Sequence, residues 1–176
     1  LYIICHDPYA QSGQGVGESL GASYVIKRPN NLSKPDDIIV ASYVGRPQTQ
    51  DEYNANLFML ADFYNAKIGF ENDRGEVIAY AKRHRKMHRL QEEFEMLDKR
   101  ELRSKTVKRQ YGMHMTEARK RQGEIYIRDW LNTIRSTNED GTQVLNMHKI
   151  YDLALLQELI KFNHKGNFDR VMAFMI

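Results

Sequence analysis

Three acidic residues stand at the ends of apolar segments that are far apart in the chain. Asp7 follows the apolar run YIIC, Glu71 ends IGFE in KIGFEND, and Asp169 opens the last apolar segment in GNFDRVMA. In α/β proteins, sites form outside the ends of strands, where distant residues meet. Clustered carboxylates repel one another unless a cation neutralises them, and Mg²⁺ and Mn²⁺ prefer oxygen ligands. The three residues are therefore candidate metal ligands, of a kind suited to two-metal phosphodiester hydrolysis.

Each acid taken alone also fits a structural role. Asp7 precedes Pro8 and could be a turn residue, Glu71 could be a solvated charge at a strand end, and Asp169 could cap a helix. The metal hypothesis depends on the three lying together.

The glycines after Asp7 do not form a nucleotide-binding loop. In AQSGQGVGES, the third glycine position of the dinucleotide fingerprint, counted from Gly13 and Gly15, is Glu18. The fingerprint must also open a helix, whereas GASYVIK continues as a strand. The chain contains no G-x-x-x-x-G-K-[ST] motif. We therefore expect no bound nucleotide.

The elements that must position these acids follow from hydrophobic patterning. Three strands are expected in succession and hence antiparallel, then a helix with a Thr49–Glu52 capping box, a fourth strand, and further helices. Parallel first and fourth strands would place Asp7 beside Glu71. The expected strands are 2–5, 22–27, 38–44 and 67–73, and the expected helices are 49–66, 75–90, 116–135, one from about 149, and a last one in FDRVMAFMI. Residues 91–110 could be helical or a short strand with a charged loop. This order predicts a mixed α/β layered fold.

Length and composition indicate one globular domain, residues 1–176, that does not span a membrane. The chain is 41% hydrophobic and 28% charged and has no apolar run long enough to cross a bilayer. Its single cysteine, Cys5, excludes an internal disulfide and fits a reducing compartment. The chain begins without Met and ends in the apolar RVMAFMI, and we expect it to be a domain excised from a longer protein.

Charge is distributed unevenly. Residues 82–128 hold 15 Lys and Arg against seven Asp and Glu, a net charge of +8, while the rest holds 11 against 16, a net of −5. Such asymmetry suits a polyanion-binding surface beside a carboxylate-rich site, although a solvated helical face would give the same pattern.

Several segments carry a resemblance to a known family. HDPYA, GASYVI, EYNANLFMLADFYNAKIGFENDRGEVI, QYGMHMTEARKRQGEIYIRDWL, LLQELIKF and GNFDRVMAF together resemble the C-terminal nuclease domain of the large terminase subunit of tailed bacteriophages. The strongest element is ADFYNA followed by IGFENDRG, because that family places its second catalytic acid in a strand followed by Asn and Gly.

The resemblance implies a ribonuclease H-like fold, with a mixed central sheet of three antiparallel strands and then parallel ones, flanked by helices. It implies a Mg²⁺- or Mn²⁺-dependent endonuclease that cuts concatemeric double-stranded viral DNA during genome packaging, with two ions during catalysis. The acids that match are Asp7, Glu71 and Asp169. The family's ATPase domain, portal and small terminase subunit would be partners of the full protein, at the procapsid portal in the bacterial host cytoplasm.

The chain departs from the family at two places. Relatives often read His-Asp-Asp in the last motif, where this chain reads Asn167, Phe168 and Asp169, so one of the two acids is present. Some relatives carry an extra acid after the first strand, for which Glu18 is the nearest candidate. Asp73 could assist Glu71.

The basic residues that follow the second acid are expected to contact DNA phosphates without sequence preference. They are Arg74, Lys82, Arg83, Arg85, Lys86, Lys108, Arg109, Lys120 and Arg121. Two alternatives stay open: a catalytically degenerate module that binds DNA or docks on the portal, and a junction resolvase or transposase of the same fold.

Overall fold

A four-stranded mixed sheet lies at the centre of the molecule. The computed structural model describes residues 1–9, 19–30, 32–73, 76–93, 110–163 and 165–176. The strand order is β3-β2-β1-β4, in which β1, β2 and β3 pair antiparallel and β4 pairs parallel to β1. The strands are β1 (Tyr2–Asp7), β2 (Gly21–Lys27), β3 (Ile38–Gly45) and β4 (Lys67–Phe70). The predicted mixed α/β class, with three antiparallel strands and a parallel fourth, is confirmed.

Chain segments distant in sequence extend the sheet beyond β4. Leu90 forms a parallel bridge to Ile68, and Met113 forms one to Glu71. Met113 N–H donates to the Phe70 carbonyl at 2.9 Å. Residues near 113 therefore lie directly beside the end of β4 that carries Glu71.

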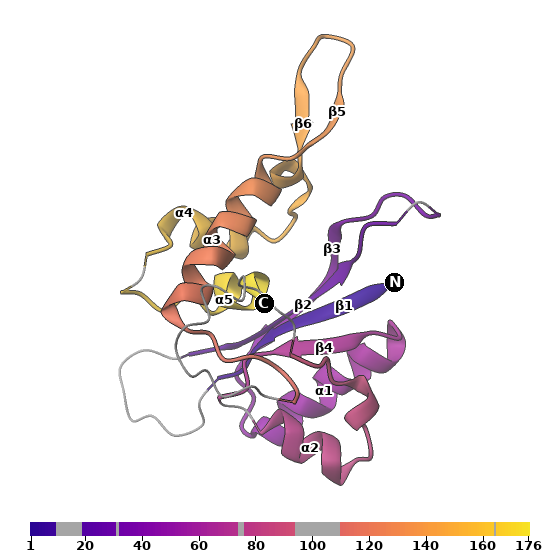
Figure 1. Cartoon of the computed structure of the whole chain (residues 1–176), viewed down its shortest axis with the longest axis vertical. Coiled ribbons are helices and arrows are strands. Elements are labelled where there is room, and N and C mark those ends of the chain that lie inside the picture. The colour runs from indigo at the N-terminus through magenta and orange to yellow at the C-terminus, as the bar shows by residue number, and fades with distance from the viewer. Residues whose placement is uncertain (10–18, 31, 74–75, 94–109, 164) are drawn as a thin grey trace.

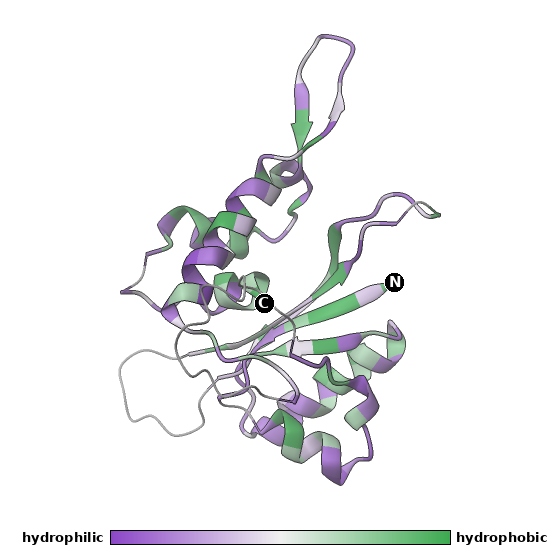
Figure 2. Ribbon diagram, in the orientation of Figure 1, coloured by the Kyte–Doolittle hydropathy of each residue, from purple (hydrophilic) through white to green (hydrophobic). Residues whose placement is uncertain are grey.

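Helices cover both faces of the sheet (Figure 1). On one face lie α1 (Gln50–Phe63) and α2 (Val77–Arg83), with the short helix η1 (Met87–Arg89) after them. On the other lie α3 (Glu117–Leu131), α4 (Leu153–Lys161) and α5 (Asp169–Met175). Each face has its own core: one includes Ile4, Leu57, Phe58, Ile68 and Phe70, and the other Ala22, Tyr24, Leu155, Val171 and Ala173. In Figure 2 the hydrophobic residues concentrate in the strands and in the helix faces turned toward them.

Side-chain caps fix where the helices begin. Thr49 accepts the Glu52 N–H at 3.1 Å at the start of α1, as the sequence predicts, and Thr116 accepts the Arg119 N–H at 3.3 Å at the start of α3. Asp152 caps α4 through the amides of residues 154 and 155. Such caps satisfy amides that have no partner inside the helix.

Several predicted boundaries are wrong. The first helix ends at Phe63 rather than 66, and the fourth strand ends at Phe70 rather than 73. The second helix ends at Arg83 rather than continuing to 90, since Arg85 adopts a left-handed conformation with φ of 56°. The helix expected from about 149 begins at Leu153, after the short helix η2 (Asn146–Lys149). The third helix ends at Leu131 instead of Arg135.

The residues after α3 form a β-hairpin that the sequence analysis did not predict. Strands β5 (Ile134–Thr137) and β6 (Gln143–Leu145) pair antiparallel, with Gly141 at φ of 84° in the turn. The hairpin projects away from the rest of the molecule (Figure 1). None of the described helices is both long and apolar enough to cross a bilayer.

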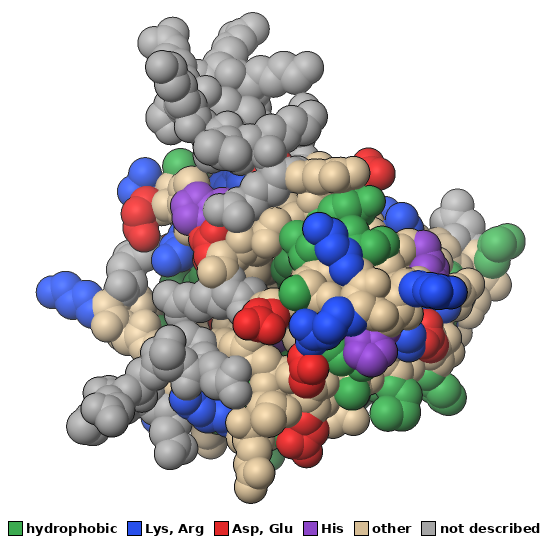
Figure 3. All heavy atoms as spheres, turned by 90° about the horizontal axis from the view of Figure 1, so that it is seen from below, with side chains coloured by type: hydrophobic (Ala, Val, Ile, Leu, Met, Phe, Trp, Pro, Cys, Tyr) green, Lys and Arg blue, Asp and Glu red, His purple; other side chains and the backbone are tan. Residues whose placement is uncertain are grey.

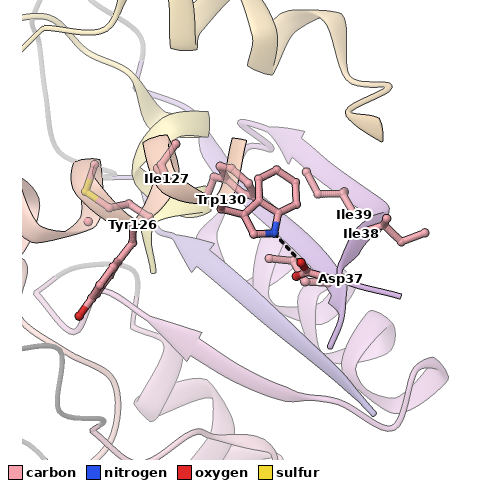
Figure 4. A pocket seen from close by; sticks show the side chains of 10 residues that line it. Asp37, Ile38, Ile39, Tyr126, Ile127 and Trp130 are labelled. Carbon is pink, nitrogen blue, oxygen red and sulfur yellow. Dashed lines mark hydrogen bonds between the residues drawn. The ribbon is translucent and has the colours of Figure 1, made fainter. Parts of the chain in front are cut away.

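The base of this hairpin is tied to the edge strand of the sheet. Arg135 donates through Nη1 to the Asp36 carbonyl at 2.7 Å and forms an ion pair with Asp37 at 3.6 Å. Trp130 Nε1 donates to the same Asp37 carboxylate at 2.9 Å, across a pocket between α3 and β3 (Figure 4). Asp37 thus connects α3 and the hairpin to β3.

Loss of the Arg135 side chain should destabilise the fold. Arg135→Ala leaves the carbonyl acceptors of buried Asp36 and partly buried Asp37 without their donor, and we expect the free energy of unfolding to fall by about 1–3 kcal/mol. Urea unfolding followed by circular dichroism measures this change. Arg128→Ala is the control, because Arg128 is exposed and its pair with Asp129 is 3.4 Å long, and exposed pairs contribute about 0–1 kcal/mol. Equal losses in the two variants would contradict the assigned role.

Candidate functional site

Parallel pairing of β1 and β4 brings Asp7 and Glu71 to neighbouring positions. The ladder pairs His6 with Phe70, so the next residue on each strand is an acid. Glu71 N–H also donates to the His6 carbonyl at 3.3 Å. The predicted juxtaposition of the two strand ends is confirmed.

Both acids belong to the sheet face that α5 covers. His6 stacks on Tyr53 of α1 at 5.2 Å, and Phe70 lies in the core on that same side. Side chains alternate along a strand, so Asp7 and Glu71 belong to the opposite face. Asp7 pairs across the ladder with Ala22, a residue of the core that α5 completes.

The third acid, Asp169, is the first residue of α5 and is held at the start of β2. Ser19 Oγ donates to Oδ1 at 3.1 Å, while the Leu20 N–H donates to Oδ2 at 2.7 Å. Asn167 Nδ2 also donates to Oδ2, at 3.1 Å. Since Ala22 is opposite Asp7 on the ladder, these contacts place Asp169 at the same edge of the sheet.

The donor chemistry of this edge fits a hard divalent cation. All three side chains offer oxygen, and Asp7 and Asp169 are only 7% and 8% exposed. A carboxylate has about four lone-pair positions, so three donors leave Asp169 capacity for a further contact. In the described part of the chain, however, no three His, Cys, Asp or Glu side chains are grouped closely enough to hold a metal ion. The metal hypothesis therefore depends on Asp7 and Glu71, which follow the paired residues His6 and Phe70.

The accessory acids proposed from sequence have different positions. Asp73 contacts His114 Nδ1 through Oδ2, just beyond the bridge between Glu71 and Met113. The side chain of His114 is 44% exposed, and no ligand spacing in the sequence singles this residue out. Glu18 lies outside the described residues.

A buried polar network lies beneath Asp7, on the α1 face. His6 is 1% exposed, and its Nδ1 is 3.0 Å from the Ala22 carbonyl and 2.9 Å from Ser23 Oγ. Ser23 Oγ is in turn 2.9 Å from Tyr53 Oη, which donates to the Tyr43 carbonyl. Burial lowers the pKa of His6 to about 4, so the imidazole is neutral at pH 7. The network ties β1, β2, β3 and α1 together next to the acids.

This buried histidine should make stability fall in mild acid. The folded-state pKa of about 4 is below the value of about 6.5 for an unfolded histidine. The folded state that holds His6 neutral therefore has its full stability above about pH 6.5. This contribution of His6 is lost as the pH falls toward 4, because the unfolded state binds the proton more readily. Between pH 7 and pH 5 we expect His6 to lower the free energy of unfolding by about 2 kcal/mol. Urea titrations of wild type and His6→Gln in EDTA measure this difference in pH dependence.

The surface histidine His88 supplies the control for that measurement, because it is exposed. His88→Gln should keep the wild-type pH dependence, while His6→Gln should flatten it. A His6→Gln variant with an unchanged slope would show that the ring protonates as readily in the folded state.

Basic residues at the end of α2 and just after it pair with acids of α1. Arg83 pairs with Asp51, and Lys86 contacts Asp62 at 2.6 Å. Arg89 also contacts Asp62, at 2.9 Å. From the side of α1 and α2, the surface accordingly shows Lys and Arg mixed with Asp and Glu (Figure 3). These cations connect α2 and η1 to α1. Part of the basic segment therefore has a structural role that does not require DNA binding.

The remaining predicted DNA contacts do not form one surface. Lys82 in α2 and Arg85 just after it are exposed. Lys120, 3.6 Å from Glu117, and Arg121 belong to α3 on the opposite side of the sheet. Arg74, Lys108 and Arg109 lie outside the described residues. We call the end of the sheet that carries Asp7, Glu71 and Asp169 the carboxylate edge. A duplex bound there could not contact all of these basic residues through one groove.

One cation that the sequence analysis missed lies at the carboxylate edge itself. Arg46 follows β3, whose last residue, Gly45, pairs with Gly21 at the start of β2. Its Nη1 donates to the Ser19 carbonyl at 2.9 Å. Arg46 lies outside the basic segment in sequence, so only strand register reveals its position.

Comparison with protein-family models, curated proteins and solved structures finds no match to this chain.

Proposed function

We propose that this chain is a metal-dependent endonuclease domain that cleaves double-stranded DNA, with a ribonuclease H-like fold of the terminase type. The observation that carries the proposal is the parallel β1–β4 pair, which places Asp7 and Glu71 next to each other on one face of the sheet. The strand order β3-β2-β1-β4 and the helices on both faces agree with the implied fold. The sequence resemblance supplies the substrate, concatemeric viral DNA during packaging.

In this proposal the chain's own residues bind the cation and orient the phosphate. Asp7 and Glu71 would hold Mg²⁺ or Mn²⁺, and Asp169, fixed by the Ser19 and Leu20 contacts, would complete the carboxylate group. A bound cation would lower the pKa of the attacking water and neutralise charge on the phosphate. Burial of Asp7 and Asp169 strengthens their interaction with a cation, since water screens buried charges less.

A second candidate function is a DNA-binding module without catalysis. Two observations favour it: the described residues form no group of three metal ligands, and three donors already contact Asp169. Such a module would bind duplex DNA in a salt-sensitive manner but would not bind Mn²⁺.

Plasmid cleavage by the full chain separates these functions. With Mn²⁺, the nuclease converts supercoiled plasmid to nicked and linear forms, and EDTA stops the reaction. The DNA-binding module would instead bind duplex DNA in a salt-sensitive manner, would not cleave it, and would show no Mn²⁺ binding in calorimetry. Strong preference for a four-way junction over linear duplex would indicate a resolvase.

A further inference from the structure

Arg46 is positioned at the carboxylate edge by the register of the sheet. β3 and β2 are antiparallel, and Gly45 pairs with Gly21. β2 and β1 are antiparallel too, and Ala22 pairs with Asp7. The end of β3, the start of β2 and the end of β1 therefore meet at one edge, where Arg46 is the exposed residue that follows β3.

The contacts that hold the Arg46 side chain include a hydrogen bond and a cation–π contact. Its Nη1 donates to the Ser19 carbonyl at 2.9 Å, and its guanidinium carbon is 5.4 Å from the centroid of the Tyr9 ring. Tyr9 is itself buried and fixed, because its hydroxyl donates to the Pro47 carbonyl at 3.1 Å and its carbonyl accepts from Gln50 Nε2 at 2.7 Å. The cation is thus fixed on a rigid support while remaining exposed.

Ser19 joins this cation to the carboxylate group. Its carbonyl accepts from Arg46, while its hydroxyl donates to Asp169 Oδ1 at 3.1 Å. The guanidinium and the Asp169 carboxylate therefore contact the same residue.

We propose that Arg46 is a substrate-positioning residue that binds a phosphate oxygen of the DNA backbone beside the carboxylates. The inference rests on the proposed function, since it takes DNA as the substrate. A group of carboxylates repels an approaching phosphate, and a fixed cation at its edge offsets that repulsion. Guanidinium suits this role because its planar set of N–H donors matches phosphate oxygens and remains charged at every physiological pH.

The test measures DNA affinity rather than cleavage. A short fluorescent linear duplex is titrated with the full chain in EDTA at several salt concentrations. Arg46→Ala should weaken binding about tenfold near 50 mM salt and lower the slope of log K against log salt by about 1, the amount for one lost phosphate contact. Arg28→Ala is the matched control, because Arg28 is an exposed arginine just beyond the opposite end of β2 and should leave the slope unchanged.

A further variant separates the charge of the side chain from its shape. Arg46→Lys keeps the charge and should restore the salt slope. The inference is overturned if Arg46→Ala and Arg28→Ala give the same slope of log K against log salt. It is also overturned if the wild type does not bind the duplex at low salt. If Arg46→Ala loses the contact but the wild type does not cleave DNA in Mn²⁺, the nuclease proposal fails and the DNA contact stands.

Discussion

Asp7→Asn should abolish Mn²⁺-dependent DNA cleavage while leaving the fold intact. Asparagine has nearly the same shape but lacks the negative charge that would bind the cation. Mutation of residues that only support a metal ligand typically reduces affinity or activity 10- to 100-fold, so loss of a direct ligand should reduce the rate at least about 100-fold. The rate of plasmid cleavage under single-turnover conditions measures the effect.

Thermal unfolding shows whether this loss comes from the metal site. Asp7 is almost buried at the end of β1, and asparagine keeps its size, so the melting temperature in EDTA should stay close to that of the wild type. Mn²⁺ should raise the melting temperature of the wild type, since a ligand that binds only the folded state stabilises it. This rise should be absent in Asp7→Asn and present in Asp129→Asn, a change at an exposed position on α3. An Asp7→Asn variant that still cuts would refute the assignment of Asp7.

The sheet was predictable from sequence because its strands are short apolar runs bounded by turn residues. Tyr2–Asp7 and Ile38–Gly45 differ from the expected strands by one or two residues. The hairpin was missed because Ile134 continues the helical spacing of α3 and is exposed in β5, so no alternating pattern marks the strand. The turn residues NEDG at 138–141 come directly after the expected helix 116–135, so they mark the end of a helix as well as they mark a hairpin turn.

The candidate site was predictable only in part. Acids at strand ends are local features, and parallel pairing follows from the helix between the third and fourth strands. Ion pairs are not local: Arg83 and Asp51 are 32 residues apart, so sequence alone could not show that the basic segment neutralises α1. Arg46 was missed for the same reason, since its position depends on the register of two strand pairs.

Gly112→Ala should be among the most destabilising single-methyl changes in the chain. Gly112 has φ of 68°, and a Cβ there would lie 2.7 Å from the Phe70 carbonyl oxygen. The left-handed conformation costs a non-glycine residue about 1–2 kcal/mol, and crowding in a packed site adds about 1–3 kcal/mol. We therefore expect the free energy of unfolding to fall by about 2–5 kcal/mol in urea titrations.

Substitutions at two other glycines separate the conformational cost from the cost of crowding. Gly141 has φ of 84°, but a Cβ there would have nothing within 4 Å, so Gly141→Ala should show the conformational cost alone. Gly45 has neither feature, and Gly45→Ala should have little effect. A Gly112→Ala loss no larger than that of Gly141→Ala would show that the 112 segment does not pack against β4.

The same substitution should also reduce cleavage under conditions in which the variant is still folded. Gly112 N–H donates to the Gln91 carbonyl at 3.0 Å, and the next residue, Met113, bridges to Glu71. A methyl group that pushes this segment away from Phe70 would displace the backbone that fixes Glu71. Gly112→Ala should therefore weaken the Mn²⁺-induced rise in melting temperature, whereas Gly141→Ala should retain it. Stability and metal binding would be lost together at residue 112 because one backbone contact supports both.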